Sequence, residues 1–157
     1  MKYEITETWK RCGLVLARDQ SAAGGSSVAG DPCIVWDEEE AAWRMVLFFA
    51  PPGHAQAICR TRDDVGPGRW EFLGPLPFAN PADLLGGYTH KPFIVMDAHR
   101  PNVAARIDGR YRLVTVSVRD GHKVVQQAYA ERLGGPWTVE KTPLIDTGEK
   151  DAFDARH

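Results

Sequence analysis

The sequence predicts an all-β protein built from two copies of a four-stranded unit, and three observations support this. Helix signals are nearly absent, and the best candidate is the short Pro81–Gly86, with Asn80 as its N-cap and a proline at its first position. The rest of the chain alternates short β-rich runs with Gly, Pro, Asp and Asn. The order of these runs is then repeated once along the chain.

The β-rich runs are four to nine residues long and are separated by turn signals, which is typical of a sandwich, a barrel or a propeller. In chain order, strands are expected at Gly13–Arg18, Cys33–Asp37, Trp43–Ala50, Ala55–Thr61, Trp70–Leu73, Phe93–Asp97, Val103–Ile107, Tyr111–Arg119, Val124–Glu131 and Thr138–Lys141.

The internal repeat favours the propeller among these folds. Each copy holds four strands in the same order, and its first strand begins at Asp31 in one copy and at Lys91 in the other. Four strands make one propeller blade, and stacked blades bury the faces that a single sheet leaves open. The matching segments are Asp31–Asp37 with Lys91–Asp97, Trp43–Phe48 with Tyr111–Val116, Gln56–Thr61 with Val125–Ala130, and Trp70–Leu73 with Trp137–Glu140.

We therefore interpret residues 1–157 as a single partial β-propeller domain, with blades at about 28–77 and 88–145 and flanking strands at both ends. Propellers close with about four to eight blades, so two blades leave sheet faces exposed. Such faces would aggregate unless covered, which predicts either a homo-oligomer or a truncated relative of a larger propeller. A β-sandwich without a site at the strand ends is the alternative.

Composition and charge exclude several classes of function. A formal net charge of -2 argues against nucleic acid as a partner. No apolar run approaches the roughly 20 residues that span a bilayer, and the N-terminus lacks a secretion signal, which predicts a cytoplasmic protein without a membrane partner. Cys12, Cys33 and Cys59 lie far apart, which argues against a disulfide framework and a zinc site. We expect no cofactor and no metal.

Three segments resemble a known enzyme family. They are Gly30–Asp37 followed by Trp43–Phe49, Lys91–Met96 followed by Asp108–Leu113, and Ala128–Thr138. Together they resemble the five-bladed propeller glycosidases, namely glycoside hydrolase family 43 and its relatives, which include invertase-like enzymes and mannoside phosphorylases. The last segment is similar to the family's A-x-S-x-x-L-x-G-P-W pattern.

The resemblance implies a carbohydrate site at a central funnel, where the innermost strand of each blade begins. An Asp before Pro in an early blade is often the general base or nucleophile of the family, which points to Asp31 as a catalytic residue. Glycoside cleavage needs a second carboxyl group as the acid, and Asp154 is the candidate toward the next blade. A turn residue that accepts backbone N–H groups is the alternative role for Asp31.

The equivalent start of the second repeat carries a lysine instead of a carboxylate, which puts catalysis by one chain in doubt. The predicted substrate-binding residues are His90, Lys91, Tyr88, Trp36 and Arg100, with core packing or exposure to solvent as the alternatives. Asp37 and Asp97 share a repeat position and are interpreted as turn residues, and His54 as part of a hairpin turn. The predicted function is a glycosidase-like protein that acts on or binds a carbohydrate; the alternative is a non-catalytic carbohydrate-binding or scaffold module.

Overall fold

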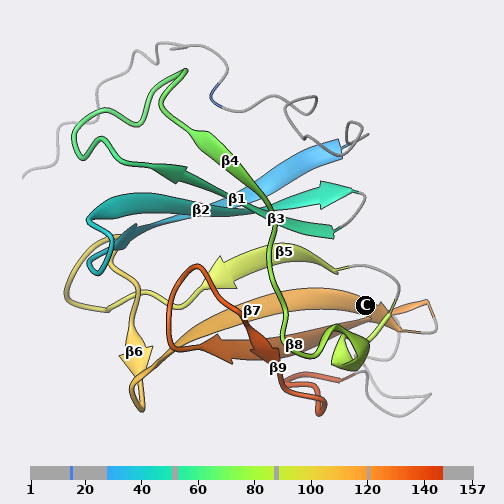
Figure 1. The fold of residues 1–157 in the computed structure, drawn as a ribbon. Helices are drawn as coiled ribbons and strands as arrows, with labels where there is room; N and C mark the ends of the chain where they lie inside the picture. The colour runs from blue at the N-terminus through green and yellow to red at the C-terminus, as the bar shows by residue number, and fades with distance from the viewer. Residues whose placement is uncertain (1–14, 16–27, 51–52, 87–88, 120, 147–157) are drawn as a thin grey trace, which may run out of the picture.

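The computed structural model describes residues 15, 28–50, 53–86, 89–119 and 121–146, and these form two antiparallel sheets (Figure 1). The first sheet has the order β1 (Val28–Asp37), β2 (Ala42–Ala50), β3 (Gly53–Cys59) and β4 (Glu71–Pro75). The second has the order β5 (Thr89–Ile94), β7 (Arg110–Arg119), β8 (His122–Ala130) and β9 (Thr138–Val139), and the short β6 (Arg106–Ile107) pairs with β7. The two four-stranded repeats are thus confirmed.

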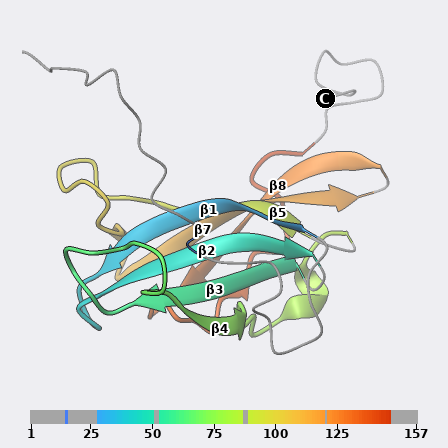
Figure 2. The ribbon, with the colours of Figure 1, turned by 90° about the horizontal axis from the view of Figure 1, so that it is seen from above.

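The two sheets are stacked, and the main hydrophobic core lies between them (Figures 1 and 2). β5 is the strand of the second sheet that contacts β1, β2 and β3. Burial of these side chains provides the main attraction between the sheets. The buried members of the core are Cys33, Val35, Val46, Leu76, Ile94, Ala104, Tyr111, Leu113, Ala128, Ala130, Leu133, Trp137 and Val139.

A second hydrophobic cluster covers the opposite face of the first sheet. Its buried members are Met45, Leu47, Phe49, Ala55, Ala57, Cys59 and Trp70. Val15 packs against this cluster, although it is far from the sheet in sequence. Buried apolar side chains therefore lie on both faces of the first sheet.

The strand registers show which residues of the two sheets are equivalent. Cys33 pairs with Val46, and Val46 with Gln56; in the second sheet Phe93 pairs with Val114, and Val114 with Gln127. The sequence matches of the first, second and fourth strands follow this register. The match of the third strand was wrong by two residues, because Cys59 is equivalent to Ala130 and not to Ala128. A shift of two keeps every side chain on its face, so the sequence pattern alone did not expose the error.

Both innermost strands begin earlier than the sequence predicted. β1 starts at Val28 and β5 at Thr89, and each contains a register shift, between Gly30 and Cys33 and between His90 and Phe93. An irregularity of this kind breaks the alternation of buried and exposed side chains on which strand prediction rests. The predicted strand Val103–Ile107 is shorter, since only Arg106 and Ile107 form β6.

The predicted helix at Pro81–Gly86 is a single 3-10 turn, Pro81–Asp83. Asn80 occupies the predicted N-cap position and Pro81 follows it, but the Asn80 side chain makes no capping hydrogen bond. It bonds the backbone of Val139 through both its amide nitrogen and its oxygen, at 2.9 and 2.8 Å. The predicted strand at Gly13–Arg18 lies outside the described residues, apart from Val15. Within the described part of the chain, no helix has the length and hydropathy of a membrane span.

Candidate functional site

The first candidate site lies where the two innermost strands begin. Asp31 and Lys91 occupy the same position in the irregularities of β1 and β5, and both are exposed. Their φ angles are +49° and +53°, and each is followed by a proline. The left-handed conformation is unfavourable for an L-residue, and more so for lysine than for aspartate. Strained positions that persist in a fold are concentrated at binding and catalytic sites.

The imidazole of His90, next to Lys91 in the chain, contacts the first sheet. Its ring meets the Phe48 ring edge-on, with the centroids 6.1 Å apart. Partial burial lowers the pKa of His90, the charges of Lys91 and Lys123 lower it further, and the Asp31 carboxylate acts in the opposite direction. One carboxylate and two ammonium groups are therefore within electrostatic range of the His90 imidazole.

Hydrogen bonds connect the buried His54 through Thr115 to the backbone of His90. The Nε2 atom of His54 is 2.5 Å from the Thr115 Oγ1 atom, and the Thr115 hydroxyl donates to the His90 carbonyl oxygen at 3.0 Å. Because that hydroxyl has one proton to donate, we infer that His54 Nε2 is the donor to Thr115. Burial, and secondarily the charge of His90, lower the pKa of His54 to about 4.

His54 was wrongly interpreted as a hairpin-turn residue, since only 4% of it is exposed. It is the third-strand partner of Phe48 in the register, and its side chain faces the second sheet. A histidine next to Gly53 is typical of a turn, so the local sequence gave no sign of burial. Only the pairing of β3 with β2, which places His54 one row from the core residue Val46, could have indicated it.

Two other predicted site residues lie at the opposite end of the strands. Trp36 is five residues along β1 from Asp31, or about 16 Å in an extended strand. Its ring meets Trp43 edge-on at 5.2 Å and is covered by the Arg62 guanidinium at 4.5 Å, and 8% of the residue is exposed. The structure does not bring Trp36 to Asp31, and a stacking surface for a sugar is not free on this ring.

Arg100 also lies away from Asp31. Its guanidinium bonds the carboxylates of Glu38 and Asp97, each at 2.9 Å, and these two charges raise its pKa. The contact with Glu38 joins the loop after β5 to the turn after β1. The remaining predicted residues, Tyr88 and Asp154, fall outside the described part of the chain.

Asp37 and Asp97 have the turn role that their shared repeat position predicted. The Oδ1 atom of Asp37 accepts the backbone N–H groups of Glu39 and Glu40 at 3.1 and 3.3 Å. The Oδ1 atom of Asp97 accepts those of His99 and Arg100 at 2.8 and 3.2 Å. Equivalent aspartates thus close equivalent turns.

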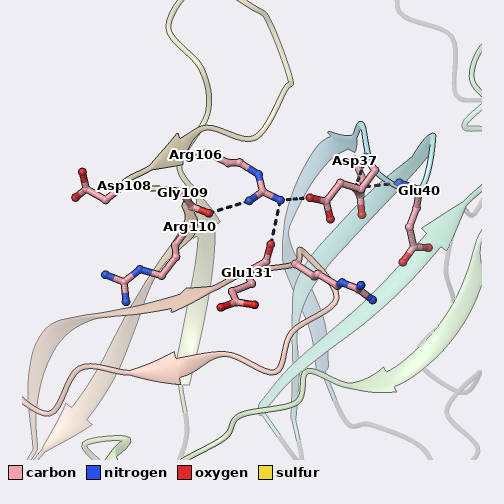
Figure 3. A pocket seen from close by; sticks show the side chains of 9 residues that line it. Asp37, Glu40, Arg106, Asp108, Gly109, Arg110 and Glu131 are labelled. Carbon is pink, nitrogen blue, oxygen red and sulfur yellow. Dashed lines mark hydrogen bonds and ion pairs between the residues drawn. The ribbon is translucent and has the colours of Figure 1, made fainter.

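A pocket of about 800 Å³ lies at the Asp37 end, between the turns of the two sheets (Figure 3). Its lining is dominated by charged groups: Asp37, Glu39, Glu40, Arg106, Asp108, Gly109, Arg110, Glu131 and Arg132. Among the described residues, no group of three or more His, Cys, Asp or Glu side chains could hold a metal ion.

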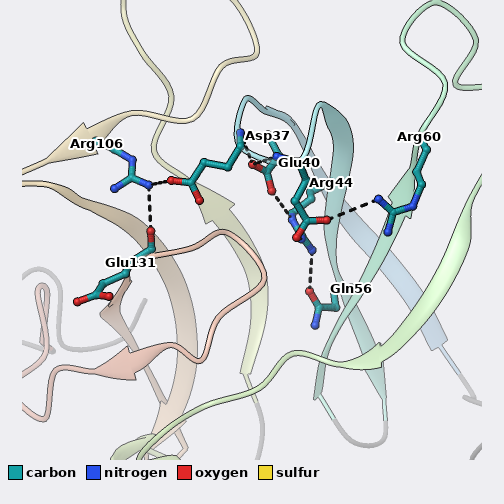
Figure 4. A network of polar contacts seen from close by, with 8 residues as sticks. Asp37, Glu40, Arg44, Gln56, Arg60, Arg106 and Glu131 are labelled. Atoms are coloured by element: carbon teal, nitrogen blue, oxygen red, sulfur yellow. Dashed lines mark hydrogen bonds and ion pairs between the residues drawn. The ribbon is translucent and has the colours of Figure 1, made fainter.

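Part of the charge at this pocket is compensated by ion pairs within the protein (Figures 3 and 4). Arg44 pairs with Asp37 at 2.7 Å and with Glu40 at 2.6 Å, and it lies 4% exposed beneath the pocket floor. Arg106 of the second sheet pairs with Glu39 of the first and donates to the Glu131 carbonyl oxygen at 3.1 Å. The Arg106–Glu39 pair joins the two sheets at this end, and the Arg44 pairs stabilise the turn between β1 and β2, so we assign the network a structural role.

Comparison with solved structures identifies the class of fold. The chain is similar to a GH43_1 enzyme from Xanthomonas citri solved with xylotriose, at 17% identity and a TM-score of 0.55 over 75% of this chain. It is also similar to CoXyl43, a GH43 beta-xylosidase/alpha-arabinofuranosidase from a compost microbial metagenome, at 14% identity and a TM-score of 0.54 over 75% of this chain. An endo-arabinase from Bacteroides thetaiotaomicron matches 76% of the chain at 18% identity, with a TM-score of 0.50.

These likenesses confirm the predicted fold class: two adjacent blades of a propeller of the glycoside hydrolase family 43 type. The chain spans only a part of each structure, 35% of the Xanthomonas enzyme, 37% of CoXyl43 and 44% of the endo-arabinase. No family model matches the sequence, and no curated protein matches it either. At such low sequence identity the comparison shows the fold alone, and the activity has to be argued from the residues of the candidate site.

Proposed function

We propose that the protein acts on or binds a carbohydrate at the beginning of β1 and β5, in a glycosidase-like site that contains Asp31, His90 and Lys91. The observation that carries this proposal is the pair of equivalent strained positions, Asp31 and Lys91, at the starts of the two innermost strands. In a propeller such strand starts surround one axis, which supports our proposal that both side chains line one funnel.

Asp31 is the residue to which we assign the carboxylate of the site. It would act as a base or as an acceptor for sugar hydroxyl groups, and His90 and Lys91 would donate hydrogen bonds to the sugar. Hydrolysis also requires a carboxylic acid at about 5–5.5 Å from the first carboxylate for retention or about 6.5–9.5 Å for inversion. We propose Asp154 for this role, from the same chain or from a neighbouring one.

The test is an Asp31→Asn substitution assayed on a panel of nitrophenyl glycosides that includes xylosides and arabinosides. Asparagine tolerates a φ of +49° as well as aspartate does, so the fold is expected to survive. Asp108→Asn is the matched control, because Asp108 is exposed at φ +52° in the turn before β7, at the other end of the strands. We expect turnover to be lost in Asp31→Asn and kept in Asp108→Asn.

The same proteins distinguish the second candidate function. A non-catalytic module would bind oligosaccharides in calorimetry without turning any of them over, and Asp31→Asn would weaken that binding. The lysine at the position equivalent to Asp31 favours this alternative, because it supplies no second carboxylate. Turnover that is equal in Asp31→Asn and wild type, or neither turnover nor binding of any glycoside, would overturn the proposal.

A further inference from the structure

The second sheet has one face against the first sheet and one face that the described residues leave open. In the alternating pattern of β7, Tyr111, Leu113, Thr115 and Ser117 are buried, and the residues between them are partly exposed. The open face also holds Phe93, 50% exposed. Its central rows are Phe93–Val114–Gln127 and Val116–Val125–Ile145, in which Ile145 forms a bridge with Val125; His90 pairs with Val116, but its ring contacts Phe48 of the first sheet.

The first sheet shows what this surface is built to contact. The rows equivalent to those two are Cys33–Val46–Gln56 and Gly30–Phe48–His54, and they form the face by which the first sheet covers the second. In that setting Cys33 is 6% exposed and Val46 is 1% exposed. The open face is therefore the equivalent of the face by which the first sheet packs on the second, and the described residues supply no sheet that covers it.

Within this chain, the surface that would match it in a head-to-tail contact is the opposite face of the first sheet. There Met45, Ala57 and Trp70 are equivalent to the core residues Leu113, Ala128 and Trp137. That face is already buried, with Leu47 4% and Phe49 1% exposed and Val15 packed on it. A second copy therefore cannot present it without displacing what lies there, whereas its own open face is available.

We propose that two copies of this chain associate through their open faces, as a two-fold symmetric dimer. The two central rows carry no ionisable side chain, and Arg112 and Lys123 lie in the rows that flank them. Ile145, 60% exposed, and the neighbouring Leu144, 55% exposed, extend the apolar surface beyond β8. Self-complementary two-fold contacts are the commonest form of homo-oligomer. Four strands about 4.8 Å apart give each copy roughly 400 Å² of projected face, which lies at the weak end of specific interfaces. The dimer is thus expected to be concentration-dependent. This inference does not depend on the carbohydrate function.

The test is sedimentation velocity of the whole chain over a wide range of protein concentration. The wild type is expected to move from monomer to dimer and to stop there. Ile145→Lys and Phe93→Lys place a charge on the open face at positions already half-exposed, so the fold is retained and the monomer should persist at every concentration. Leu73→Lys is the matched control, since Leu73 on β4 is 39% exposed away from this face; it should dimerise like the wild type.

Circular dichroism melts of each variant confirm that the fold is intact. Three outcomes would overturn the proposal: a wild type that stays monomeric at all concentrations, an assembly that grows beyond two copies as a head-to-tail contact would, and a dimer that Ile145→Lys and Phe93→Lys leave unchanged. Loss of the dimer with unaltered turnover or binding of glycosides would separate this surface from the proposed carbohydrate site.

Discussion

The two sheets follow one register but use it for different chemistry. In the first sheet both faces are buried, and its polar side chains Arg44, Gln56 and His54 are enclosed with them. In the second sheet the equivalents are Arg112, Gln127 and Val125, none of which is fully buried. The two blades therefore share their backbone geometry. The burial of each position depends on whether a neighbouring sheet covers it.

The comparison extends to the candidate site. Asp31 and Lys91 share their position, their left-handed backbone and the following proline, and yet they carry opposite charges. The shared geometry belongs to the repeat, and the charge is where the two positions differ. A site built from two equivalent positions with opposite charges can bind a polar ligand asymmetrically, which two identical blades could not do.

The largest expected effect separates the two tryptophans of the fourth strands. Trp137 is fully buried between the sheets, and Trp70 is 8% exposed on the other face of the first sheet. We expect Trp137→Ala to lower the free energy of unfolding by about 4–5 kcal/mol, because it opens a cavity in the core between the sheets, and Trp70→Ala by about 3 kcal/mol. Urea denaturation measures both values. Equal losses, or a larger loss for Trp70→Ala, would contradict the assignment of the main core to the interface between the sheets.

The next effect compares the two turn aspartates. Asp37 is 2% exposed and pairs with the buried Arg44, whose second partner is the partly exposed Glu40; Asp97 pairs with Arg100, which is half-exposed. Asp37→Ala removes the buried partner and leaves Arg44 with only the partly exposed carboxylate of Glu40, so it should cost about 3 kcal/mol. Asp97→Ala should cost far less, since exposed ion pairs contribute little.

Asparagine at the same two positions separates the turn from the charge. Asp37→Asn and Asp97→Asn keep an oxygen that accepts the turn N–H groups, and only Asp37→Asn removes the charge from a buried partner. Thermal melts of the four variants give the comparison. If Asp97→Ala proved as destabilising as Asp37→Ala, the turn hydrogen bonds and not the buried ion pair would carry the effect.

Much of this fold could be predicted from the sequence because it rests on repetition. The matches of Cys33 with Phe93 and of Trp70 with Trp137 hold in the register, since apolar and aromatic residues recur at fixed intervals along the strands. The strand starts at Val28 and Thr89 could not be predicted, because the left-handed residues at 31 and 91 interrupt the pattern. Backbone φ at a non-glycine residue leaves little trace in a single sequence.

The candidate site could be predicted only in part, for a related reason. Asp31 and Lys91 follow from the repeat, so their common position was visible, and that position holds in the register. Trp36 and Arg100 were chosen by residue type, and type does not say which end of a strand a side chain lies near. The burial of His54 cannot be predicted from its sequence neighbours, because it arises from the packing of the second sheet against the first.

The smallest effect tests His54 against Val125, the residue at the equivalent position of the second sheet. The pKa of His54 is about 4 in the folded protein and near 6.5 when the chain unfolds. The unfolded chain therefore binds one more proton than the folded one between these pH values, and stability falls as the pH is lowered from about 6.5 to about 4. From neutral pH to pH 5 this loss of stability amounts to about 2 kcal/mol.

His54→Val should remove this dependence of stability on pH, whatever it does to stability at neutral pH, and His122→Val at the exposed start of β8 should retain it. Urea titrations at several pH values measure the slope, and an unchanged slope in His54→Val would mean that the buried imidazole is not the group that titrates.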